Sequence, residues 1–124
     1  MELSLYPTTV VDTLKRMRKL LLTPNTWIKR ELHKVATQPD GTVLHQFCLV
    51  GALDKVGGRY NGHTAAQTQK LLSETENLLN ALTNDKFGTR AISYNDRETT
   101  TNKDIINLID NAIKVAEKKE ASPA

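Results

Sequence analysis

One cysteine and three histidines are the residues of this sequence that could support nucleophilic catalysis. Cys48 precedes a stretch that predicts a short helix, and a helix N-terminus favours the thiolate form of a cysteine. His33, His45 and His63 are the available imidazole bases. A Cys48 nucleophile activated by His45 or His63 is therefore one hypothesis. The neighbours of Cys48 are apolar, however, which is typical of a cysteine that fills a core, and this interpretation is favoured.

Recognisable metal and phosphate motifs are absent from the sequence. The histidines do not have the spacing of a helical motif such as HExxH, and a lone cysteine cannot form a Cys-rich zinc site. The sequence contains neither GxGxxG nor GxxxxGK followed by Ser or Thr, two motifs that hold nucleotide phosphates. We therefore expect no metal ion and no cofactor.

Three short segments combine aromatic and charged residues and could hold a ligand. Trp27 with Lys29 could stack on a base and pair with a phosphate. Residues 57–60 place backbone N–H groups beside a cation and a ring, and residues 94–97 form a polar corner. In each segment a structural role, as hairpin anchor, helix stop or turn, is the favoured alternative. The candidate ligand-binding residues are Trp27, Lys29, Arg59, Tyr60, Arg90, Tyr94, Asn95, Asp96 and Arg97.

Four helices are expected to position these side chains, because apolar residues recur at intervals of three and four. The predicted helices cover residues 8–22, 47–56, 65–83 and 102–119. Thr8 or Thr9 can cap the first helix. Thr64 with Gln67, and Thr101 with Asp104, have the spacing of capping boxes.

The stretch between the first two helices has an ambiguous pattern. Pro39-Asp40-Gly41 predicts a turn, and the residues after it have strand propensity. We predict a β-hairpin of about 27–36 and 42–46, with a helix over 26–36 as the alternative.

Three shorter features complete the expected elements. Gly51 lies inside a predicted helix, where it costs about 1 kcal/mol relative to alanine, so it indicates close packing against a neighbour. Gly57-Gly58 predicts a left-handed helix stop. Residues 91–94 are expected to be extended and to lead into a turn at 95–97.

The fold class that follows is mainly α (α+β), with about four helices around one core and a small hairpin. The 124 residues, 39% of them apolar and 25% charged, fit one globular domain over 1–119 and a frayed tail over 120–124. Charges interleave with the apolar residues near the start, and no apolar run reaches about 18 residues. We therefore expect a cytosolic protein without a signal peptide or membrane span.

The net charge of +3 is unevenly distributed. Residues 1–59 contain nine Lys and Arg against five Asp and Glu, whereas residues 60–124 contain eight against nine. This could favour an anionic partner near the N-terminal half, although solvated helix faces are the favoured explanation. The modest charge and the lack of a helix-turn-helix signature disfavour duplex DNA.

Several short motifs also carry a family resemblance. They are Trp27, Gly41, residues 48–53 (CLVGAL), residues 92–96 (ISYND) and Thr101, in that order. This order resembles a small family of unknown function from bacteria and phages, with the pattern W…G…CLxGAL…I-x-W/Y-N-D…T. The resemblance covers about residues 9–116, and Tyr94 stands where we associate tryptophan with the family. It implies a bacterial or phage setting and one domain, and it implies no activity.

The function expected from these observations is non-catalytic binding. The protein would sequester an anionic ligand, such as a nucleotide signal, or a host protein. One alternative is an enzyme that uses Cys48 with His45 or His63. A second is a structural protein that oligomerises through an exposed apolar stripe.

Overall fold

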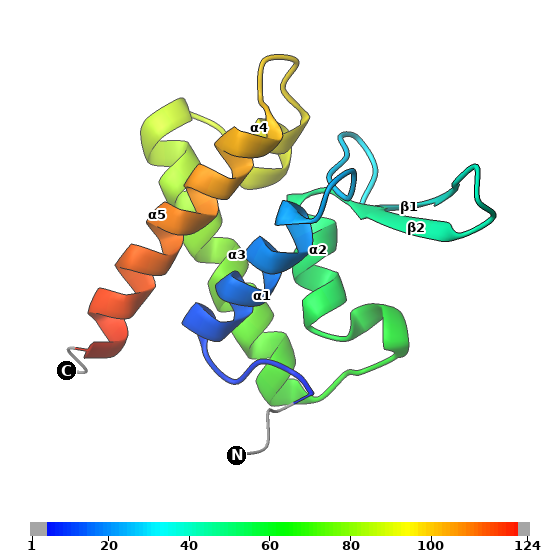
Figure 1. Ribbon diagram of the computed structural model, residues 1–124. Helices are drawn as coiled ribbons and strands as arrows, with labels where there is room; N and C mark the ends of the chain where they lie inside the picture. Colours follow the sequence, from blue (N-terminus) through cyan, green and yellow to red (C-terminus); the bar gives the residue numbers. More distant parts are fainter. Residues whose placement is uncertain (1–4, 122–124) are drawn as a thin grey trace.

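The computed structural model describes residues 5–121, which form a bundle of helices with a hairpin projecting from one side (Figure 1). The elements run in the order α1 (Val10–Leu22), β1 (His33–Thr37), β2 (Val43–Phe47), α2 (Leu49–Val56), the 3-10 helix η1 (Arg59–Asn61), α3 (Ala66–Phe87), α4 (Ala91–Asp96) and α5 (Asn102–Ala121). The predicted class, mainly helical with a small hairpin, is confirmed. The one additional α-helix is the short α4.

The hydrophobic core lies where α1 meets α2, α3 and α5 (Figure 1). Leu14, Met17 and Leu21 of α1 are completely buried, and their spacing places them on one face of the helix. Ile105 and Ile109 of α5 are completely buried as well. Each such side chain contributes about 1.5–3 kcal/mol, so this cluster stabilises the bundle that carries the shorter elements.

Two of the three predicted helix caps are confirmed. Thr9 Oγ1 accepts a hydrogen bond from the Asp12 backbone N–H at 3.0 Å, which caps α1. At the start of α5, Thr101 and Asp104 exchange side-chain-to-backbone bonds at 2.9 and 3.1 Å. The third prediction is wrong, because α3 begins at Ala66 and its N-cap residue, Ala65, makes no side-chain capping bond.

The hairpin is shorter than predicted, and the alternative helix over 26–36 is wrong. β1 begins at His33, because the chain before it takes a left-handed turn at Arg30, where φ is 69°. Trp27 therefore lies outside the strand and forms only an isolated bridge with Phe47. The predicted turn is confirmed: Gly41 has a φ of 87°, and hydrogen bonds from Thr42 lower the pKa of Asp40.

The segment predicted to be extended, residues 91–94, is instead the first part of α4. Its first N–H, on Ala91, donates to the side-chain oxygen of Asn80 on α3 at 2.8 Å. Near its end, Thr100 Oγ1 donates to the carbonyl of Tyr94 at 2.7 Å. Backbone groups of this short helix thus form hydrogen bonds with side chains outside it. Hydrophobic periodicity along the sequence cannot predict such partners.

Helices α3 and α5 both extend past their predicted ends. α3 continues through residues 84–87 and stops at Gly88, whose φ is 68°. α5 continues to Ala121, and the rest of the expected tail, residues 122–124, lies outside the described residues. No helix within residues 5–121 is long and apolar enough to cross a membrane.

Candidate functional site

Asn95 on α4 is completely buried and makes four hydrogen bonds. Its Oδ1 accepts from Trp27 Nε1 at 2.6 Å and from the Leu49 backbone N–H at 3.0 Å. Its Nδ2 donates to the Ile28 carbonyl and to Asp96 Oδ1, each at 3.1 Å. Asn95 therefore joins α4 to the loop after α1 and to the first turn of α2.

The neighbours of Asn95 extend this cross-link. Asp96 Oδ1 also accepts from the Arg30 backbone N–H at 2.7 Å. Lys29 Nζ donates to the carbonyls of Arg97 and Glu98, at 2.5 and 3.1 Å. We call Trp27, Ile28, Arg30, Leu49, Asn95 and Asp96 the Asn95 network. Four of the predicted ligand-binding residues, Trp27, Lys29, Asn95 and Asp96, thus bond to the chain itself, which supports their structural interpretation.

Cys48 lies at the N-cap of α2 and is 2% exposed. Its sulfur accepts a hydrogen bond from the Gly51 backbone N–H at 3.3 Å. Burial raises the pKa of the Cys48 thiol, so the nucleophilic thiolate is disfavoured. Within residues 5–121, no imidazole forms a hydrogen bond with this sulfur, because the predicted partner His45 bonds to His33 and His63 bonds to Thr68.

Brief treatment of the folded protein with iodoacetamide at about pH 8 is expected to leave Cys48 unmodified, because the thiol is buried and its pKa is raised. Intact-mass measurement is the readout, and the same treatment in denaturant, which should add one alkyl group, is the control. Complete alkylation of the folded protein on the same timescale would contradict this expectation and favour the enzyme alternative.

In the loop after α2, the cationic side chain of Arg59 bonds to other residues of the chain. Arg59 bonds to Asp54 at 2.5 Å and to Gln69 at 3.0 Å, so its guanidinium is already paired. Tyr60 is 42% exposed and lies beside the His33 ring, with the ring centroids 5.0 Å apart. The internal pairing of Arg59 therefore favours its structural interpretation over a joint phosphate and base site with Tyr60.

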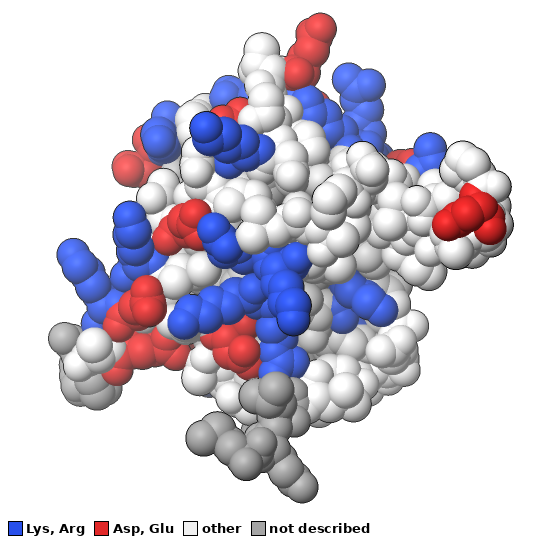
Figure 2. All heavy atoms as spheres, in the orientation of Figure 1, with Lys and Arg blue, Asp and Glu red and all other residues white. Residues whose placement is uncertain are grey.

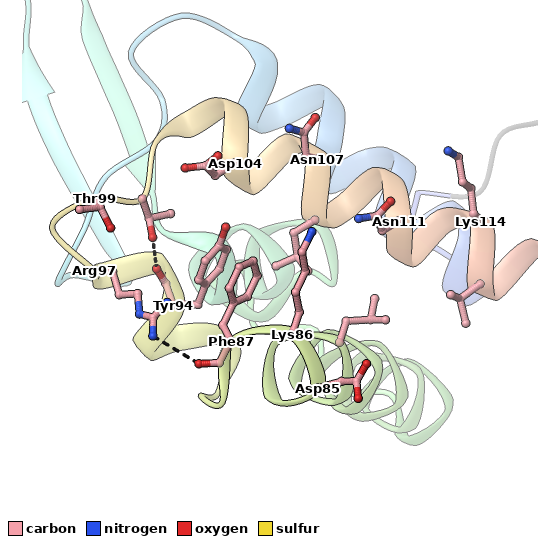
Figure 3. Close-up of a pocket in the computed structure, with 14 residues that line it drawn as sticks. Asp85, Lys86, Phe87, Tyr94, Arg97, Thr99, Asp104, Asn107, Asn111 and Lys114 are labelled. Atoms are coloured by element: carbon pink, nitrogen blue, oxygen red, sulfur yellow. Dashed lines mark hydrogen bonds between the residues drawn. The ribbon is translucent and has the colours of Figure 1, made fainter.

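Tyr94 and Arg97, the two other members of the polar corner, line a cleft of about 920 Å³ between the C-terminal half of α3, α4 and α5 (Figure 3). The Tyr94 ring stacks on Phe87, with centroids 4.2 Å apart and planes within 11°. Burial raises the pKa of the Tyr94 hydroxyl, so it remains a protonated donor at neutral pH. Arg90 occupies the N-cap position of α4 without a side-chain capping bond, is exposed, and is not part of the cleft lining.

Two cations lie near this aromatic pair, and a third lines the same cleft. The Arg97 guanidinium lies 5.9 Å from the Phe87 ring centroid and donates to the Phe87 carbonyl at 3.3 Å. The Lys86 amine lies 5.5 Å from the same ring and extends toward the space between α3 and α5 in Figure 3. Lys114 adds a third positive charge from α5. We call Lys86, Phe87, Tyr94, Arg97 and Lys114, together with Asn107 and Asn111, the α3–α5 cleft site.

The opposite wall is polar and includes acidic groups. Asn107 and Asn111 supply amide donors and acceptors from α5, while Asp85 and Asp104 contribute carboxylates to the lining. The balance is three cations against two carboxylates, and the volume falls within the range of small-molecule sites. The arrangement can stack a flat ring and pair with an anionic group.

The sequence analysis did not include residues 85–87, or the α5 residues of this site, among the candidate ligand-binding residues. A signal for those α5 residues existed, because Asn107, Asn111 and Lys114 follow helical spacing within the predicted last helix. The stacking of Phe87 on Tyr94 had no such signal, because α3 was expected to end before Phe87.

Basic side chains of the N-terminal half gather over the middle of the face seen in Figure 2, where α1 lies in Figure 1. Part of this charge is balanced locally. Arg18 pairs with Asp110 of α5 at 2.6 Å, and Arg16 pairs with Asp12 at 3.0 Å. The excess of positive charge therefore partly serves to join helices.

The fold and the cleft define a small helical-bundle protein with a hairpin arm and an open cleft whose lining is partly polar and partly apolar. Residues 5–115 match the Family of unknown function (DUF6197), and the chain belongs to that family. The resemblance noted in the sequence is thereby confirmed. No curated protein and no solved structure matches the chain.

Proposed function

We propose that the protein is a non-catalytic binding protein that takes up an anionic small molecule with a flat ring, a nucleotide being the favoured class, in the α3–α5 cleft site. The observation that carries the proposal is the Phe87–Tyr94 stack with Lys86 and Arg97 beside the Phe87 ring, in a cleft that Lys114 also lines. In this proposal the protein acts in the cytosol of a bacterial cell, including one infected by a phage.

The proposed binding mode assigns a task to each group. Phe87, which is partly buried and stacks on the buried Tyr94 ring, offers an aromatic surface for a base, and base stacking contributes about 1–3 kcal/mol. Lys86, Arg97 and Lys114 offer positive charge for a phosphate. The amides of Asn107 and Asn111 can read the polar edge of the base.

Three alternatives from the sequence remain predictions: host-protein binding, the Cys48 enzyme and oligomerisation. The buried thiol disfavours the enzyme, as the alkylation experiment tests. No observation supports host-protein binding or oligomerisation as specifically as the aromatic and cationic cluster supports nucleotide binding.

A thermal-shift screen with a nucleotide panel that includes cyclic dinucleotides is expected to raise the Tm with at least one member, because a ligand that binds only the native state stabilises it. Calorimetric titration of that nucleotide should then show at least about tenfold weaker binding for Lys114→Gln and for Arg97→Ala, since each loses a charged phosphate partner. Arg97→Ala leaves the backbone carbonyl that Lys29 contacts unchanged.

The matched control is Lys118→Gln, which removes the same charge one turn along α5, outside the cleft. It should bind the nucleotide as the unmodified protein does. Absence of a shift with every nucleotide would overturn the nucleotide assignment. Equal weakening by Lys118→Gln would show that net charge, and not the cleft, determines binding.

A further inference from the structure

The hairpin carries two histidines that bond to each other outside the cleft lining. In the strand register, His33 faces Phe47 and Val35 faces His45, so both imidazoles lie on one face as diagonal neighbours. His33 Nε2 lies 2.9 Å from His45 Nδ1, the ring centroids are 5.1 Å apart, and the planes agree within 8°. One ring therefore donates an N–H to the lone pair of the other.

The number of protons on the two rings decides whether this hydrogen bond can form. When both imidazoles are neutral, one of the facing nitrogens carries a proton and the other accepts it. One added proton produces an imidazolium that donates to a neutral ring, so the bond remains and becomes charge-assisted. A second added proton places an N–H on each facing nitrogen. The acceptor is then lost, and two positive charges lie side by side.

The His33 ring also forms a contact between the hairpin and the helical part of the molecule. It lies against Tyr60 of η1, with centroids 5.0 Å apart, and against Phe47, with centroids 4.9 Å apart. Phe47 is 1% exposed, whereas Val35 and Val43 are 52% and 53% exposed on the projecting strands (Figure 1). A two-stranded hairpin is at best marginally stable by itself. Its order therefore depends in part on how the His33 ring is held.

No carboxylate offsets a second proton on the pair. Within residues 5–121, neither imidazole forms an ion pair with an acidic side chain. Lys34 of β1 points to the opposite face of the hairpin, β2 has no ionisable side chain other than His45, and Glu31, before β1, is exposed. Doubly protonated rings would thus repel each other without compensation.

The elements packed against the hairpin add no free charge either. Burial raises the pKa of the Tyr60 hydroxyl and that of the Cys48 thiol, so both groups keep their protons in neutral and acidic solution. Asp54 of α2 pairs with Arg59 of η1. Around the two rings, the groups whose charge changes between about pH 5 and 8 are therefore the imidazoles themselves.

We propose that His33 and His45 form a proton-sensitive latch, which holds the hairpin against η1 near neutral pH and releases it in acid. The hydrogen bond exists with no added proton or with one and is lost with two, so its contribution to hairpin stability disappears as the pH falls. The His33 ring then turns away from His45 and loses its contacts with Phe47 and Tyr60. This property is independent of nucleotide binding in the cleft.

The test is amide hydrogen exchange of the full chain, measured by mass spectrometry at about pH 8 and about pH 4.5, on either side of the range in which histidines ordinarily gain their charge. Each rate is divided by that of an unstructured chain at the same pH, which gives a protection factor. We expect the protection of residues 33–47 to fall at least about fivefold in acid, as for the loss of one hydrogen bond.

His45→Gln removes one of the two proton acceptors and keeps an exposed polar side chain, so the core remains intact. In this variant the hairpin protection should differ less than about twofold between the two pH values. His63→Gln is the matched control, since His63 stacks on Tyr6 and bonds to Thr68 elsewhere in the fold. It should keep the full response of the hairpin to acid.

A second readout counts the protons directly. The nitrogen NMR shifts of the imidazoles report how many protons each ring carries, and both rings should carry two at the pH where protection is lost. Loss of protection while one ring is still neutral would overturn the proposal. Unchanged protection in the unmodified protein, or an equal fall in His45→Gln, would overturn it as well.

Discussion

Replacing Asn95 with leucine is expected to lower the free energy of unfolding by about 3–5 kcal/mol, the largest effect that we predict. Leucine has the same number of side-chain heavy atoms as asparagine, branched at the same carbon, but cannot form hydrogen bonds. The substitution leaves the Trp27 indole N–H, the Leu49 backbone N–H and the Ile28 carbonyl without their partner. Each buried polar group left unpaired costs about 1–3 kcal/mol. Thermal and denaturant unfolding should both report the loss, with Tm lower by more than about 10 °C.

Asn84→Ala is the control for this experiment, because Asn84 is an exposed asparagine within α3. It should change the free energy of unfolding by less than about 0.5 kcal/mol. A loss below about 1 kcal/mol in Asn95→Leu would contradict the Asn95 network. If Asn95→Leu fails to fold, Trp27→Phe provides the graded test, since it removes one of the four hydrogen bonds and keeps a ring.

Gly51→Ala is expected to destabilise the protein by about 2–4 kcal/mol, although alanine is normally preferred to glycine inside a helix by about 1 kcal/mol. A Cβ at residue 51 would overlap the backbone carbonyl oxygen of Leu32 and lie 2.7 Å from its carbonyl carbon. The same carbonyl accepts a hydrogen bond from the Cys48 N–H, so the loop cannot retreat without breaking that bond. Denaturant unfolding measures the change.

The exchange Ala81→Gly, on the exposed side of α3, provides the reference for Gly51→Ala. It should cost about 1 kcal/mol, which isolates the intrinsic preference of helices for alanine. Gly57→Ala offers a second comparison, because the atoms nearest to its Cβ would belong to the Leu72 side chain and not to a backbone. A stabilised Gly51→Ala variant would refute the close approach of Leu32 to α2.

Several of the residues in the resemblance pattern are now explained by contacts. Cys48 caps α2, Gly51 admits the Leu32 carbonyl, and Asn95 binds Trp27 and α2. These contacts build the fold, and the residues of the proposed nucleotide site lie mostly outside the pattern. Tyr94 is the member that belongs to both, since it follows the pattern and stacks in the cleft.

Local patterns were sufficient to predict the long helices, the Thr9 cap, the box between Thr101 and Asp104 and the turn at Gly41. Each depends on groups a few residues apart, which interact similarly in any protein. The same patterns failed for α4, where Asn80 and Thr100 satisfy the backbone of a single turn. A one-turn helix has no periodicity of its own to detect.

The amino-acid order alone predicted a helical domain of one core and favoured a hairpin and a buried cysteine over their alternatives, because burial and backbone bonding leave regular traces in nearby residues. The hydrogen bonds between Trp27 and Asn95 and between His33 and His45, and the stacking of Phe87 on Tyr94, could be seen only in the tertiary structure. Such pairs are set by how whole elements pack and by strand register, and these depend on the entire chain at once.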